Sequence, residues 1–151
     1  MVKELSYEII WTILAQVPDP EIPVVSIVDL GIVRDVQFSE NIYKIIITPT
    51  YSGCPAFSFI KDEIVKEFES NNINNYKIET ILSPPWTTDW MSSDVKSKLK
   101  KAGISPPSDN VICPQCDSTK VEVISNFGST SCKAFYRCID CKEPFQHFKK
   151  I

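Results

Sequence analysis

The sequence lacks the long apolar runs and the leader segment that would place a protein in or across a membrane. No stretch approaches the roughly 18 consecutive apolar residues that a spanning helix needs. The N-terminus carries Lys3 and Glu4, and no apolar segment of a secretory signal follows them. We therefore expect a soluble, cytoplasmic protein.

An excess of positive charge is also missing. Residues 1–105 carry 10 basic and 14 acidic side chains, and residues 106–151 carry 6 and 5, within a net charge of −3. Non-specific affinity for nucleic acids comes mostly from Lys and Arg side chains that neutralise phosphates. The balance argues against DNA or RNA as the main partner, although it leaves room for a local basic patch.

Disulfide bonds are not expected either, although the chain contains six cysteines. The cytosol keeps thiols reduced, and 151 residues with 43% apolar content can bury a hydrophobic core without covalent cross-links. Metal binding or thiolate chemistry is therefore the better explanation for the cysteines.

The spacing of apolar and β-branched residues predicts a small α+β domain. The predicted order is a helix over 5–17, strands over 32–38 and 42–48 joined as a hairpin, a helix over 57–68, a strand over 76–82, and a helix over 92–102. This order implies helices packed on one face of a mixed or antiparallel sheet. The following Ser-Pro-Pro-Ser segment is typical of a linker, so we expect this domain over residues 1–104, a linker over 105–110 and a separate unit over 111–151.

Two Cys-x2-Cys pairs in the last unit predict a metal site. Cys113 and Cys116 form one pair and Cys138 and Cys141 the other, 21 residues later, which is close to the spacing of tetrathiolate zinc sites. Four protein ligands leave zinc no open position, so a structural role in a zinc ribbon is expected. An iron site and disulfides remain as alternatives. Strands are expected over residues 120–126, 131–137 and 144–148.

Two further residues of this unit could belong to the site, but simpler roles are favoured. Cys132 lies between the two pairs and is expected to be a small buried residue, with a replacement ligand or a redox thiol as the alternative. His147 is the only histidine, and no acid or nucleophile lies near it in sequence, so we assign it no role.

A lone cysteine, Cys54, lies just before Pro55, which suits the first position of the second predicted helix. The free N–H groups and the positive end of the helix dipole would favour its thiolate, making it a better nucleophile or metal ligand. One thiolate cannot hold a cluster, so other groups such as Asp19, Glu21 or Thr50, a second subunit or a client protein would have to contribute. The alternative is a small buried residue at a strand-to-helix turn.

Two tryptophans, Trp86 and Trp90, flank Asp89 in a proline-stiffened loop. Aromatic side chains in such loops often mark partner surfaces. Packing under the sheet is an equally good explanation, so both remain open at this stage.

Several motifs of the chain resemble those of one bacterial family. They are Asp-Pro-Glu-Ile-Pro (19–23), Asp-Leu-Gly-Ile-Val (29–33), Thr-Pro-Thr-Tyr-Ser-Gly-Cys-Pro (48–55) and Pro-Trp-Thr-Thr-Asp-Trp-Met (85–91). Together with the four-cysteine ribbon they resemble the PaaD (PaaJ) family, encoded with bacterial phenylacetyl-CoA monooxygenase (epoxidase). The first domain is similar to iron-sulfur assembly domains of SufT-type proteins. The resemblance covers nearly the whole chain.

The resemblance implies an accessory subunit in phenylacetate degradation that assists assembly or delivery of the iron-sulfur cluster of the reductase component. Cys54 matches the family's functional cysteine, and Asp19 and Glu21 match its acidic loop. The chain is not expected to be the oxygenase, because it has no helix with a Glu-x-x-His pair to bind two irons. Structural zinc, a transient iron-sulfur cluster, the oxygenase and reductase subunits as partners, and a homodimer are all compatible with the resemblance. The alternative is a non-catalytic scaffold subunit of the oxygenase complex.

Overall fold

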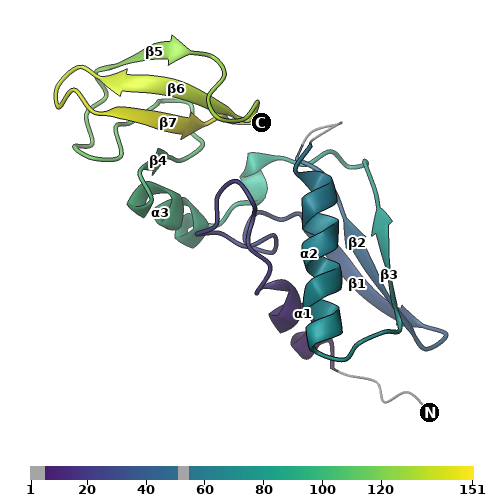
Figure 1. The fold of residues 1–151 in the computed structure, drawn as a ribbon. Helices are drawn as coiled ribbons and strands as arrows, with labels where there is room; N and C mark the ends of the chain where they lie inside the picture. The colour runs from purple at the N-terminus through teal and green to yellow at the C-terminus, as the bar shows by residue number, and fades with distance from the viewer. Residues whose placement is uncertain (1–5, 51–54) are drawn as a thin grey trace. The chain divides into compact units, whose positions relative to one another are not determined.

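A computed structural model describes residues 6–50 and 55–151 (Figure 1). The chain divides into two compact units, one that ends at Trp86 and one over Thr87–Ile151, and each is described by itself. Within the described residues, no helix combines the length and the apolar character that crossing a membrane would require.

The first unit is an α+β domain built on a mixed sheet. Its strands lie in the order β1-β2-β3, with β1 and β2 antiparallel and β2 and β3 parallel. Helix α1 packs against both α2 and β1. The elements are α1 (Tyr7–Leu14), β1 (Val33–Ser39), β2 (Ile42–Ile47), α2 (Phe57–Ser70) and β3 (Tyr76–Thr80). The predicted fold class is confirmed for this unit.

Local sequence explains where these elements begin and turn. The Ser6 side chain accepts a hydrogen bond from the Ile9 amide and caps α1. Glu40 and Asn41 adopt left-handed backbone conformations, with φ of 52° and 61°, and form the predicted tight turn between β1 and β2. The turn fixes the register in which alternate β2 side chains face the core.

The core of the first unit lies between these helices and the sheet. Every third or fourth residue of the helices and every second residue of β2 contributes to it. Its fully buried side chains include Ile10, Leu14, Ile27, Leu30, Tyr43, Ile45, Ile47, Ile64 and Phe68.

The second unit contains a four-stranded sheet in the order β4-β7-β6-β5. Only β4 and β7 pair in parallel, and the other neighbours are antiparallel. Its elements are the 3-10 helix η1 (Thr88–Trp90), α3 (Ser93–Lys101), β4 (Ile104–Ser105), β5 (Val121–Ser125), β6 (Lys133–Cys138) and β7 (Pro144–Phe148). Gly103, with φ of 82°, ends α3 as expected, because only glycine adopts this conformation without strain.

The structure places the first residue of the predicted 105–110 linker in a strand. Ser105 belongs to β4, where it pairs with His147 of β7, and it is only 1% exposed. Its hydroxyl donates to the Ile112 carbonyl at 2.8 Å. Helix α3, expected in the domain over 1–104, packs against β4 and belongs to the second unit. The boundary between the compact units lies instead between Trp86 and Thr87.

The two ends of the second unit are joined by hydrogen bonds. The Ile151 carbonyl accepts from the Thr87 hydroxyl at 2.6 Å and from the Thr88 amide at 3.0 Å. The Thr88 hydroxyl donates to the same carbonyl at 3.1 Å. These contacts close the unit around its sheet.

Candidate metal centre

The two Cys-x2-Cys segments form two similar turns. In the first, the Cys113 amide donates to the Ser118 carbonyl at 2.9 Å. In the second, the Cys138 amide donates to the Glu143 carbonyl at 2.9 Å. The residue after each second cysteine, Asp117 or Lys142, has a left-handed backbone with φ of 61° or 68°. This conformation reverses the chain and lets both sulfurs of each pair point to one place.

All four sulfurs converge as the spacing predicts. The Sγ atoms of Cys113 and Cys141 are 3.7 Å apart, those of Cys116 and Cys138 are 3.5 Å apart, and all four lie within 4.8 Å of one another. Zinc–sulfur bonds of about 2.3 Å in a tetrahedron place the sulfurs about 3.8 Å apart. The donor set and its size therefore fit a single tetrahedral metal ion. None of the five described cysteines forms a disulfide.

The pKa values of the thiols indicate that the deprotonated cluster needs a bound cation. The Cys141 amide donates to the Cys138 sulfur at 3.4 Å. This bond, with weaker contributions from the Cys116 and Cys141 side chains and the Asp140 backbone, lowers the pKa of the Cys138 thiol to about 7 against the opposing effect of burial. At Cys116 the Ser118 amide favours the thiolate, but the neighbouring sulfurs and burial together outweigh it and raise the pKa to about 12. Full deprotonation of the cage therefore needs a positive ion to offset the repulsion among thiolates.

Two of the four cysteines are also part of a small hydrophobic core. Cys113 and Cys138 are 0% exposed and pack with Phe145. Val111, Val121 and Tyr136 cover this small cluster from its sides. Cys116 and Cys141 are exposed, so the four-cysteine cluster lies at the surface of the unit.

One polar contact between the two turns was not identified from the sequence. The Ser118 hydroxyl donates to a carboxylate oxygen of Asp140 at 2.5 Å, joining the chain after the first pair to the chain inside the second. Such residues stabilise the orientation of metal ligands. A serine two residues after Cys116 and an aspartate between Cys138 and Cys141 were the only available signals.

Cys132 and His147 do not join the four-cysteine cluster. Cys132 is buried, and its sulfur lies 2.9 Å from the Thr130 hydroxyl, which confirms the expected structural position. His147 is buried in a T-shaped contact with the Tyr136 ring, and its Nδ1 has no hydrogen-bond partner within the described part of the chain. Burial lowers the pKa of His147 below its usual 6.5, against the opposing effect of a hydrogen bond to the Ser105 backbone.

The three residues predicted as a partner surface, Trp86, Asp89 and Trp90, differ in how far they are exposed. Trp86 is only 3% exposed, and its Nε1–H donates to the Leu30 carbonyl at 2.7 Å. Burial and a satisfied ring nitrogen support the packing explanation for Trp86 and leave it little surface for a partner. Asp89 is exposed and Trp90 is half-buried in η1, so partner contact through these two residues stays a prediction.

The acidic loop around Asp19 has a structural explanation of its own. Asp19 is buried, and its Oδ1 accepts hydrogen bonds from the amides of Glu21 and Ile22, both at 2.9 Å. The carboxylate thereby holds the proline-rich turn in shape. Glu21 and Thr50 are half-buried. Cys54 lies outside the described residues, so its predicted role and neighbours stay predictions.

Two family descriptions match the two halves of the chain. An iron-sulfur cluster assembly protein family matches residues 8–70, and a PaaD zinc beta ribbon domain matches residues 98–149. The first match lies within the first structural unit. The second match includes the end of α3 and all four cysteines.

Solved structures resemble the iron-sulfur assembly half. A domain of unknown function, DUF59, from Bacillus anthracis is 34% identical with a TM-score of 0.56, covering 61% of this chain and 89% of that one. A conserved hypothetical protein from Thermotoga maritima is 30% identical with a TM-score of 0.54, covering 66% of this chain and 98% of that one.

Curated relatives include partial and whole-chain matches. The Fe-S protein maturation auxiliary factor YitW of Bacillus subtilis is 39% identical over 57% of this chain and 85% of its own length. A protein of Escherichia coli K12 that is named as one of the subunits of 1,2-phenylacetyl-CoA epoxidase is 46% identical, covering 94% of this chain and 92% of that protein. The chain therefore belongs to the PaaD family, in which an iron-sulfur cluster assembly domain is followed by a zinc β-ribbon.

Proposed function

We propose that the chain is a cytoplasmic accessory subunit of a phenylacetyl-CoA epoxidase system that helps to assemble or deliver the iron-sulfur cluster of the reductase component. The observation that carries this proposal is the pairing of an iron-sulfur assembly domain with a closed thiolate cage in a single chain. The Escherichia coli relative, named as part of the epoxidase, supports the setting, and the Fe-S maturation factors support the activity.

The two groups of thiols would have different roles. Cys113, Cys116, Cys138 and Cys141 would hold one structural zinc ion, since four protein ligands leave no position for a substrate or water. The ion would supply folding free energy rather than reactivity. Cys54 would be the acting thiol, with Asp19, Glu21 or Thr50 as neighbours, and the cluster would be its cargo.

The test is cluster occupancy of the reductase when it is produced together with this chain. We expect Cys54→Ala to leave zinc content and folding unchanged while lowering the iron and acid-labile sulfide of the reductase several-fold. Cys132→Ala is the matched control, because it removes a buried thiol outside both sites. Full cluster loading with Cys54→Ala, or an equal loss with Cys132→Ala, would contradict the proposal.

A scaffold role within the oxygenase complex is the second candidate, favoured by the name of the Escherichia coli relative as part of an enzyme. A scaffold would remain in the active complex at fixed stoichiometry, whereas a maturation factor would contact the cluster-free reductase and leave it once loaded. Affinity purification of the tagged chain from cells that make the whole system distinguishes the two. Retention with the active enzyme together with normal loading in Cys54→Ala would favour the scaffold.

A further inference from the structure

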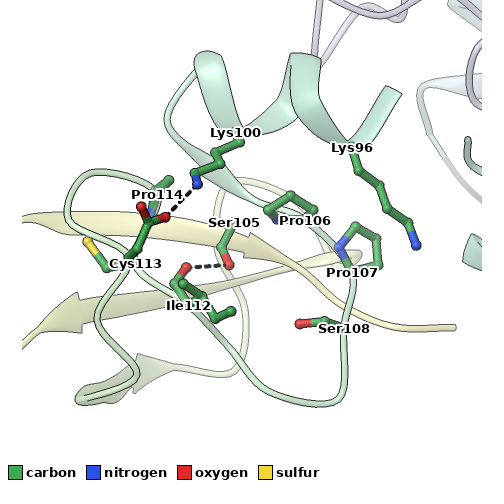
Figure 2. Close-up of a pocket in the computed structure, with 10 residues that line it drawn as sticks. Lys96, Lys100, Ser105, Pro106, Pro107, Ser108, Ile112, Cys113 and Pro114 are labelled. Carbon is green, nitrogen blue, oxygen red and sulfur yellow. Dashed lines mark hydrogen bonds and ion pairs between the residues drawn. The ribbon is translucent and has the colours of Figure 1, made fainter. Parts of the chain in front are cut away.

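A pocket in the second unit lies beside Cys113 of the metal centre. Neither the structural metal site nor the proposed role in cluster assembly uses it. Its volume is about 360 Å³. Three segments form it: the C-terminal part of α3, the proline-rich chain after β4, and the first cysteine turn (Figure 2). All three belong to one compact unit.

The floor of the pocket is apolar and stiff. Pro106, Pro107, Ile112 and Pro114 line it, and Ile112 is 40% exposed. The Ser105 hydroxyl, which also lines the pocket, is already donated to the Ile112 carbonyl and fixes two sides of the wall to each other (Figure 2). Proline rings and this bond limit rearrangement, so an apolar side chain could enter without a large ordering cost.

The rim of the pocket is basic. Lys96 and Lys100 lie one helical turn apart on α3, and both line the pocket (Figure 2). Lys100 is paired with Asp117 at 2.5 Å. Lys96 is half-buried and, within the described residues, has no ion-pair partner, so it is the cation left to receive a carboxylate.

The charge extends along the helix beyond the pocket itself. Between Ser93 and Lys101, α3 carries four lysines and one aspartate, although the whole chain has a net charge of −3. A small free acid would use only the cation at the rim. A peptide with one apolar anchor and several carboxylates would use both the pocket and the basic helix around it.

We propose that this pocket binds an acidic segment of a partner protein, with an apolar side chain of the segment on the proline floor and an adjacent carboxylate on Lys96. The inference goes beyond the role in cluster assembly and does not depend on it. The occupant follows from charge complementarity and from the apolar lining.

The experiment is a titration of the zinc-loaded, isotope-labelled full chain with a defined probe, acetylated and amidated Glu-Glu-Phe-Glu-Glu, followed by NMR. We expect backbone signals of residues 96–100 and 105–114 to shift. Lys96→Glu should weaken binding about tenfold, and the neutral Lys96→Gln should weaken it less. Lys101→Glu is the matched control, because it makes the same charge change on the same helix outside the pocket lining.

Three results would overturn the proposal. The first is the absence of shifts at millimolar peptide, and the second is an equal loss of affinity with Lys101→Glu and Lys96→Glu. The third is that hexanoate shifts the same signals at the same concentration, which would make the pocket a site for small organic acids. In the peptide-free variants, unchanged signals from Cys116, Cys138, Cys141 and strands β5, β6 and β7 show that the fold is intact. Since the assay needs no reductase, its failure is distinct from failure of the proposed function.

Discussion

The two units of this chain are stabilised in different ways. The first buries a conventional core of aliphatic and aromatic side chains between α1, α2 and the sheet. The second has a smaller core, and two of its most buried side chains, Cys113 and Cys138, also belong to the four-cysteine cluster. A short domain that cannot bury enough apolar surface can replace the missing burial with metal–ligand bonds. We therefore expect the two units to unfold in response to different changes, the first to a loss of core packing and the second to a loss of the metal.

Removal of one cage ligand should have the largest effect. Cys138→Ser replaces a fully buried sulfur that faces the other three, and it should remove most of the metal affinity, which is on the order of 10 kcal/mol for structural zinc sites. We expect zinc content to fall and the NMR signals of the second unit to collapse toward those of an unfolded chain. Signals of the first unit should persist.

Unfolding of both units together on loss of the metal would contradict their separate stabilisation. Cys132→Ser serves as the control, because this buried thiol lies outside the cage and should leave zinc content unchanged.

A cavity in the first core should produce the reverse pattern. Ile64 is fully buried, and Ile64→Ala should destabilise the first unit by about 2–5 kcal/mol in urea unfolding. Zinc stoichiometry should not change. Loss of zinc in this variant would show that the cage depends on the first core.

Removal of the hydrogen bond from Trp86 to Leu30 should have a smaller effect on stability. Trp86→Phe keeps a buried ring but leaves the Leu30 carbonyl without the Nε1–H donor, at a cost of about 1–3 kcal/mol. We expect this loss in the first unit by chemical denaturation, with binding of epoxidase subunits unchanged. Unchanged stability with weakened binding of those subunits would instead restore Trp86 as a partner residue.

The smallest effect concerns pH. Burial lowers the pKa of His147, so below pH 6.5 the unfolded chain binds a proton that the folded chain does not. The unfolded state then binds more protons, and stability falls with decreasing pH by at most about 1.4 kcal/mol per unit until the folded pKa is reached. Above pH 6.5 this group contributes no slope.

The measurement is the difference in unfolding free energy between the wild type and His147→Gln from pH 7 to pH 5. Acid release of zinc affects both proteins, so their difference isolates the histidine. The stability of the wild type relative to the variant should decrease as the pH falls. A constant difference would contradict a buried neutral imidazole.

The sequence predicted the parts of this molecule that depend on nearby residues. Cys113 and Cys116 are close in the chain, as are Cys138 and Cys141, so their spacing alone predicted the cage that the sulfur distances support. The hairpin turn at Glu40 and Asn41 and the end of α3 at Gly103 were predictable for the same reason.

Features made by distant residues were not predictable. The segment after Ile104 has the composition of a linker, but its first residue, Ser105, belongs to strand β4 because it pairs with His147 some forty residues later. The sequence could not decide whether Trp86 packs inside the domain or faces a partner, because its hydrogen bond goes to Leu30, 56 positions away. The pocket beside Cys113 needs three separate segments, and no local pattern marks it.

The most direct test of the account is the metal and acid-labile sulfide content of the chain after anaerobic purification. We predict one zinc ion per chain without sulfide, unchanged in Cys54→Ala and lost in Cys138→Ser. Iron with sulfide that disappears in Cys138→Ser would make the four-cysteine cage itself the cluster site and would contradict the separation of a structural cage from an acting thiol.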